Sequence, residues 1–103
     1  MQIYLDNSAT TKPRPEAIAA AQKVLQQHWG NPSSLHSWGN RSATVIETAR
    51  MQVADLLNAS SPESIVFTSG GTEADNLAIL GVARQYSTPQ HIIISSVEHS
   101  AID

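Results

Sequence analysis

Amphipathic stretches and short apolar runs alternate along the chain, and clusters of turn-forming residues separate them. Two stretches in the first half repeat their apolar residues at the 3.6-residue period of a helix. The first follows Pro15, a residue that suits a helix start, and ends at Gly30. The second begins at about Asn40 and is broken by Pro62. The apolar positions are Ile18, Ala21, Leu25 and Trp29 in the first stretch and Ala43, Ile46, Ala49, Val53 and Leu57 in the second.

Three further apolar runs, at residues 3–5, 65–67 and 91–94, have the β-prone composition of strands. A third helical stripe lies between the last two runs, begins near Thr72 and closes before Pro89. Near-continuous apolar strands are typical of a parallel sheet covered on both faces, in which right-handed crossovers join the strands. The pattern therefore predicts an α/β fold with a strand–helix–strand unit in its second half.

The expected sheet has few strands for an α/β domain, and residues 99–103 resemble the beginning of another helix. We therefore expect residues 1–103 to be one incomplete unit, the amino-terminal piece of a larger enzyme domain. Within it, residues 1–60 form an amino-terminal segment with two helices, and residues 61–103 begin the sheet. Exposed strand edges and apolar faces would make such a piece prone to aggregation on its own.

Composition narrows the function classes. The net charge is −3 and the six basic residues form no run, so the chain lacks the basic stripe of a nucleic-acid surface. The absence of cysteine excludes a disulfide framework, a thiolate metal site and a cysteine nucleophile within these residues, and we predict no metal site. No signal peptide or membrane-span pattern is present, which leads us to expect a cytoplasmic protein without membrane contact.

The turn around Gly70 and Gly71 is the strongest candidate for ligand chemistry. Glycines tolerate left-handed backbone angles and close ligand approach, and Thr72 with Asp75 resembles a capping pair at a helix start. Free N–H groups and the helix dipole would favour an anion there. The spacing matches neither GxGxxG nor a P-loop. The alternative is a purely structural strand-to-helix turn in which Thr72 caps the helix.

His99 is the second candidate, because it follows the predicted strand at residues 91–94. Ligands of open parallel sheets collect at the carboxyl ends of strands, where the Gly70 turn would also lie. The imidazole could stack on a flat ring, transfer protons, or simply cap a helix and bond to Glu98. His36 has a similar ambiguity.

Taken together, the motifs resemble the cysteine desulfurases of the class V aminotransferase group. The matching segments read YLDNSATT at residues 4–11, GNPSS followed by His36 at residues 30–36, IVFTSGGTEADNLA at residues 65–78, and Glu98-His99. Their order and spacing match the amino-terminal quarter of the family. The resemblance implies the large domain of pyridoxal-phosphate fold type I, an aspartate-aminotransferase-like and parallel-sheet-rich architecture whose cofactor-binding part begins in residues 61–103.

The resemblance also implies roles for individual residues. Gly71 and Thr72 match the positions that bind the phosphate of pyridoxal 5′-phosphate, and His99 matches the histidine that stacks on the pyridine ring and assists proton transfer. His36 lies in a loop near the active site or dimer contact of relatives. The implied partners are L-cysteine, a second subunit in a homodimer, and a sulfur-acceptor or scaffold protein of iron–sulfur cluster assembly.

Departures from the family concern catalysis. The Schiff-base lysine and the persulfide-forming cysteine belong to later parts of the family's chain; Lys12 and Lys23 lack the lysine's context, and cysteine is absent. The parent enzyme is expected to convert L-cysteine to L-alanine, with sulfur passing to an enzyme persulfide, whereas residues 1–103 alone are expected to be inactive. Two alternatives stay open: a non-catalytic α/β phosphate-binding module, and another class V enzyme such as a selenocysteine lyase.

Overall fold

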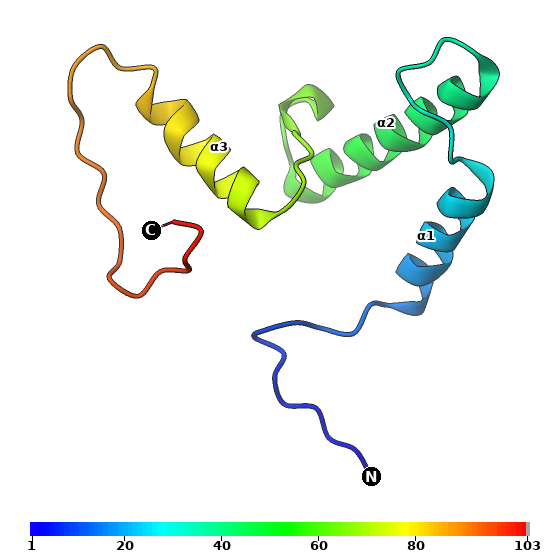
Figure 1. Cartoon of the computed structure of the whole chain (residues 1–103), viewed down its shortest axis with the longest axis horizontal. Coiled ribbons are helices and arrows are strands. Elements are labelled where there is room, and N and C mark those ends of the chain that lie inside the picture. Colours follow the sequence, from blue (N-terminus) through cyan, green and yellow to red (C-terminus); the bar gives the residue numbers. More distant parts are fainter. Residues whose placement is uncertain (103) are drawn as a thin grey trace. The chain divides into compact units, whose positions relative to one another are not determined.

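The computed structural model describes residues 1–102, and helices are its regular elements (Figure 1). They are α1 (Pro15–Gln27), α2 (Ser37–Leu57), the short 3-10 helix η1 (Pro62–Ser64) and α3 (Gly71–Ala83). The chain divides into two compact units: the first comprises Met1–Ile65 and the second begins at Val66. The first unit holds α1, α2 and η1, and the second holds α3.

Both helices predicted in the first half are present. Proline occupies the first position of α1, where a missing N–H costs nothing, and the helix ends three residues before Gly30. Helix α2 begins at Ser37, earlier than the expected Asn40, because the His36 side chain caps it. It ends at Leu57, and the left-handed backbone of the C-cap residue Asn58 (φ 51°, ψ 38°) closes the last turn.

The corner between α1 and α2 is closely packed. The buried Ser42 hydroxyl lies 2.7 Å from the carbonyl oxygen of His28, at the end of α1, to which it donates a hydrogen bond. A Cβ on Gly39 would lie 2.6 Å from the carbonyl oxygen of Asn31, and one on Gly30 would lie 2.6 Å from that of Trp38. Only glycine allows backbones to approach this closely, so these residues determine the path of residues 30–36.

The carboxyl-terminal half of α2 is tied to the segment that follows it. Arg50 forms an ion pair with Glu47 at 3.2 Å and also donates a hydrogen bond to the carbonyl oxygen of Ile65. Ser61 caps η1 by accepting a hydrogen bond from the N–H of Glu63. Arg50 therefore holds the end of the first unit against α2.

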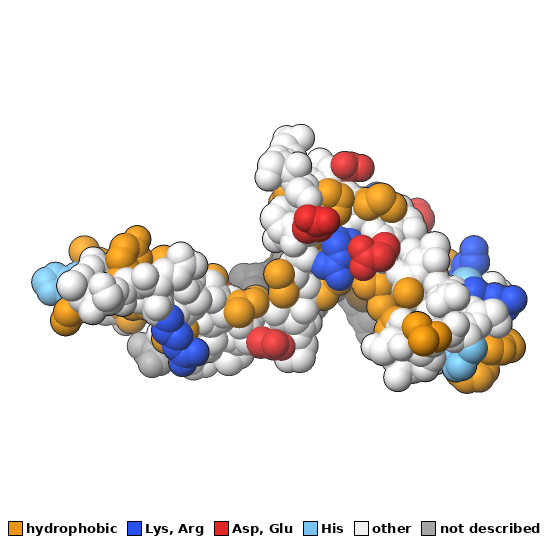
Figure 2. Space-filling model, turned by 90° about the horizontal axis from the view of Figure 1, so that it is seen from above, with side chains coloured by type: hydrophobic (Ala, Val, Ile, Leu, Met, Phe, Trp, Pro, Cys, Tyr) orange, Lys and Arg blue, Asp and Glu red, His pale blue; other side chains and the backbone are white. Residues whose placement is uncertain are grey.

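The predicted strands are not formed within residues 1–102. The runs at residues 3–5, 65–67 and 91–94 have no regular structure, and the parallel-sheet-rich architecture is therefore not confirmed. A strand needs a neighbour to supply its ladder hydrogen bonds, and the three runs do not pair with one another. Their side chains stay largely in solvent; Ile93, for example, is 94% exposed. Figure 2 shows hydrophobic side chains reaching the surface over several parts of the chain.

No helix in the described residues is both long and apolar enough to cross a membrane.

Candidate functional site

The start of α3 differs in detail from the expected cap. Gly70, not Thr72, is the N-cap residue, and Thr72 lies in the first turn of the helix. The tolerance of glycine for left-handed angles is not used here: Gly70 is extended (φ 170°, ψ 179°), and no glycine of residues 1–102 has a left-handed backbone. The turn is made by extended backbone, and the hydroxyl of Thr68 donates to the Gly70 carbonyl at 3.1 Å.

The capping pair joins Ser69 and Glu73 and does not involve Asp75. One carboxylate oxygen of Glu73 accepts hydrogen bonds from the backbone N–H of Ser69 at 2.7 Å and from its hydroxyl at 2.6 Å. These two bonds stabilise the charged carboxylate, the hydroxyl bond more strongly, and they lower the pKa of Glu73. The sequence expectation placed the first member of this pair three residues too late and the second two residues too late, because it took Thr72 for the cap.

This arrangement leaves hydrogen-bond donors free at the start of α3. The first intrahelical bond runs from the N–H of Ala74 to the Gly70 carbonyl, so the N–H groups of Gly71, Thr72 and Glu73 have no intrahelical acceptor. The carboxylate of Glu73 accepts from Ser69 and does not occupy the free N–H groups of the first turn. A Cβ built on Gly70 or Gly71 would meet no atom within 4 Å. We call the N–H groups of Gly71 and Thr72, with the exposed Thr72 hydroxyl, the N-terminal cup.

The N-terminal cup fits a phosphate group. Its donors are unoccupied in the described part of the chain, the space beside the glycines is open, and the helix dipole adds positive potential. Phosphate oxygens are strong acceptors and would satisfy N–H groups that the helix itself leaves unpaired. Gly71 and Thr72 thus supply the donors that a phosphate group would need.

His99 lies in the same unit as the N-terminal cup, in a turn at residues 99–102. Its Nδ1 atom accepts a hydrogen bond from the backbone N–H of Ala101 at 3.1 Å, and its carbonyl accepts one from the N–H of Ile102 at 2.9 Å. No bond to Glu98 forms among the described residues, so that part of the structural alternative is wrong. The exposed imidazole keeps Nε2 available for another partner.

Asn76, which sequence reasoning missed, connects the two candidates. Its side-chain amide donates to the carbonyl of Thr72 at 2.8 Å and to the carbonyl of Ala101 at 3.4 Å. The first bond is local to α3, whereas the second crosses to the turn that carries His99. The sequence could have indicated the bond to Thr72, since an asparagine four residues after Thr72 lies on the same side of a helix. The second depends on tertiary contact.

His36 belongs to the first unit and has a structural role. Its Nδ1 accepts a hydrogen bond from the N–H of Gly39 at 3.3 Å, which caps α2.

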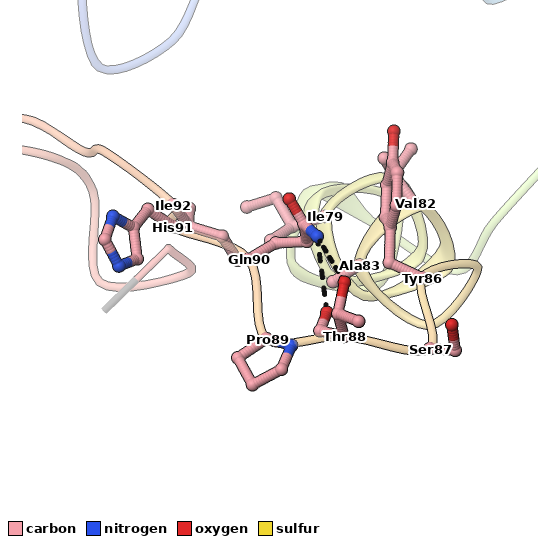
Figure 3. Close-up of a pocket in the computed structure, with 10 residues that line it drawn as sticks. All are labelled: Ile79, Val82, Ala83, Tyr86, Ser87, Thr88, Pro89, Gln90, His91 and Ile92. Atoms are coloured by element: carbon pink, nitrogen blue, oxygen red, sulfur yellow. Dashed lines mark hydrogen bonds between the residues drawn. The ribbon is translucent and has the colours of Figure 1, made fainter.

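A hollow of the second unit lies away from these residues, at the other end of α3 (Figure 3). Ile79 and Val82 of α3 face the extended segment around Gln90, whose side chain bonds back to Thr88. The lining of this hollow is mainly apolar and includes no residue of the N-terminal cup, so the hollow offers no anchor for phosphate. Residues 1–102 also contain no group of three or more histidine, aspartate or glutamate side chains arranged to hold a metal ion.

Comparison with known proteins supplies the family. The model of the aminotransferase class-V family matches residues 3–103.

The chain belongs to the class V aminotransferase family.

Relatives within the family are similar along almost the whole chain. A "NifS/IcsS protein homolog" of Lactobacillus delbrueckii subsp. bulgaricus is 52% identical over 103 residues, which cover 97% of this chain and 26% of that protein. The "Cysteine desulfurase IscS" of Dictyoglomus turgidum is 49% identical, covering 98% of this chain and 26% of that protein. A "Selenocysteine lyase" of Xenopus tropicalis is 38% identical with the same coverage. The chain thus spans about a quarter of the length of these relatives.

Proposed function

We propose that this class V aminotransferase chain is the amino-terminal part of a cysteine desulfurase that uses pyridoxal 5′-phosphate. The observation that carries the proposal is the N-terminal cup, whose free donors match a phosphate, in a chain 49% identical to a protein named cysteine desulfurase. The proposed overall reaction is L-cysteine plus an enzyme thiol giving L-alanine plus an enzyme persulfide. The sulfur atom leaves the substrate carbon and joins the thiol sulfur, so atoms and charge balance.

The chain's own residues have two tasks in this proposal. The N–H groups of Gly71 and Thr72 and the Thr72 hydroxyl bind phosphate, which anchors and orients the cofactor without reorganisation of the helix start. His99 offers its ring face for stacking and its Nε2 atom for proton transfer. When bound, the pyridinium ring of the cofactor supplies an electron sink for the substrate carbon. The lysine that carries the cofactor and the thiol that takes up sulfur would come from other parts of the protein.

We further propose that the three exposed apolar runs become strands of a parallel-sheet-rich fold type I large domain. The exposed backbone and side chains of residues 91–94 would gain ladder partners and cover from neighbouring strands. The hollow beside Ile79 and Val82 would be filled in the same way, because helices of such folds pack against the sheet. Homodimer formation, an iron–sulfur assembly partner and a cytoplasmic location belong to the same proposal.

Selenocysteine lyase is the second candidate. It has support from the Xenopus tropicalis relative, whose 38% identity is lower than the 49–52% of relatives with cysteine desulfurase or NifS names. Release of alanine by the full-length protein, measured with cysteine and with selenocysteine, separates the two. A desulfurase releases alanine from cysteine and carries the sulfur atom as a persulfide on its own thiol, whereas a selenocysteine lyase releases alanine from selenocysteine.

Two substitutions in the full-length protein test the N-terminal cup. Gly71→Pro removes one N–H while keeping the fold, because residue 71 is the first helical position and Gly70 is already extended. Thr72→Val removes the hydroxyl and keeps the shape. Each loses one hydrogen bond to a charged group, so we expect the affinity for pyridoxal 5′-phosphate to fall by about tenfold or more. Titration followed by the absorbance of the bound cofactor measures it.

Pyridoxal without phosphate is the matched ligand control, and Gly81→Ala is the control variant. Gly81 lies in the middle of α3, and a Cβ there meets no atom within 4 Å. Neither substitution in the cup should change the affinity for pyridoxal. Equal binding of pyridoxal 5′-phosphate by the wild type and both cup variants would contradict the assignment of phosphate to Gly71 and Thr72.

A further inference from the structure

The backbone of Ala101 is held at two points, through its N–H and through its carbonyl oxygen. Its N–H donates to His99 Nδ1 at 3.1 Å, and its carbonyl oxygen accepts from the Asn76 side-chain amide at 3.4 Å. The same amide donates its other proton to the Thr72 carbonyl at 2.8 Å. An asparagine amide has two donor protons, so both bonds form at once. Asn76 therefore links the first turn of α3 to the turn that carries His99.

The bond from Ala101 determines where the neutral imidazole carries its proton. A backbone N–H can only donate, so Nδ1 of His99 must be the unprotonated, accepting nitrogen. In the neutral ring the proton is then on Nε2. His36 shows the same relation on another element, where the N–H of Gly39 donates to its Nδ1. In both histidines a backbone N–H selects the tautomer in which Nε2 carries the proton.

We propose that Asn76 is a positioning residue for His99: by holding the Ala101 backbone in place it keeps the imidazole in the Nε2–H tautomer, in a defined orientation relative to the N-terminal cup. Without the Asn76 amide, the turn at residues 99–102 loses its hydrogen bond to α3, the Ala101 residue becomes free to move, and its N–H no longer stays on Nδ1. The role of His99 in cofactor chemistry rests on the proposed function; its tautomer does not.

Magic-angle-spinning NMR of the full-length protein labelled with 15N-histidine, without added cofactor, reads the tautomer directly. The His99 signals are assigned by their loss in His99→Gln. Asn76→Leu has a similar shape and no donor, whereas Asn76→Gln retains an amide. We expect one neutral form, Nε2–H, in the wild type and both tautomers in Asn76→Leu, with the Nδ1–H share raised at least fivefold. Asn76→Gln should return toward the wild type.

An unchanged tautomer in Asn76→Leu, or a wild-type His99 protonated at Nδ1, would overturn the proposal. Binding of inorganic phosphate and of pyridoxal 5′-phosphate is measured on the same samples. Asn76→Leu leaves the donors of the N-terminal cup in place, so its phosphate affinity should match that of the wild type. If the wild type binds no pyridoxal 5′-phosphate while the tautomer shifts as expected, the proposed function fails and the positioning by Asn76 stands.

Discussion

Glycines in two regions of the chain are required for opposite physical reasons. In the corner between α1 and α2, Gly39 is surrounded by backbone, and an added Cβ would lie 2.6 Å from the Asn31 carbonyl oxygen. At the start of α3, Gly70 and Gly71 face open space, with nothing within 4 Å of an added Cβ. Gly39 lets two backbone segments pack closely together. Gly70 and Gly71 instead leave open space beside the unpaired N–H groups of α3.

The same contrast extends to the polar groups of the two regions. In the corner, the buried Ser42 hydroxyl has its acceptor on the chain itself, the His28 carbonyl. In the N-terminal cup, the Thr72 hydroxyl is exposed and has no partner in the described residues. A satisfied polar group stabilises the fold, while an unsatisfied one in an open position is available to a ligand. The comparison separates structural from ligand-binding motifs within one short chain.

Replacing Gly39 by alanine should give the largest effect. The new methyl group would meet backbone carbonyls that cannot rotate away, so the corner must shift, and we expect the free energy of unfolding to fall by about 3 kcal/mol or more. Urea denaturation of the full-length protein measures the loss. Gly81→Ala is the control: it adds the same methyl in open space within α3 and should stabilise by about 0.5–1 kcal/mol. Similar effects of both substitutions would show that the corner is not closely packed.

Removing the Ser42 hydroxyl should give an intermediate effect. Ser42→Ala leaves the His28 carbonyl without its hydrogen bond in a buried position, and we expect a loss of about 1–2 kcal/mol in the free energy of unfolding. Thr48→Ala on the same helix is the matched control, because that exposed hydroxyl only bonds back to the Thr44 carbonyl at 2.8 Å. Its cost should be within about 0.5 kcal/mol of zero. The two values coming out equal would contradict the distinction between buried and exposed hydroxyls.

Acidification should give the smallest change in stability, and this change arises at the start of α3. Hydrogen bonds from Ser69 lower the pKa of Glu73 below its ordinary value in the folded chain. Glu73 therefore contributes stability above the unfolded-state pKa, and this contribution is lost as the pH falls through the lower, folded-state value. The group is exposed, so the change is small.

Glu73→Gln isolates this contribution of the carboxylate. The variant should have the same pH dependence of unfolding as the wild type above pH 5 and a weaker one below about pH 4. Parallel thermal unfolding of the two proteins at a series of pH values shows the difference. Superimposable curves throughout would mean that the bonds from Ser69 do not stabilise the charged form.

Local patterns predicted the helices well and the ends of helices less well. The stripe containing Ile18 and Leu25 and the one following Asn40 both mark real helices, since helical hydrogen bonds close within a few residues. The caps were harder. His36 caps α2, although histidine is not among the residues favoured at that position. Gly70 caps α3 without a side chain to accept a hydrogen bond, so its role had no polar signal in the sequence.

The sequence by itself determined the helices, the family and the positions of the candidate residues Gly71, Thr72 and His99. Each of these depends on residue identity and short spacing. Only the tertiary structure decided that Asn76 joins α3 to Ala101. The bond between Ser69 and Glu73 is local, and the sequence interpretation missed it because it took Thr72 for the cap. Within residues 1–102 the strands were decided neither by the sequence nor by the structure. Their apolar runs are visible in the sequence, but a strand forms only when another strand completes its hydrogen bonds. Contacts between distant residues have no local signature, and for that reason the structure was needed to place them.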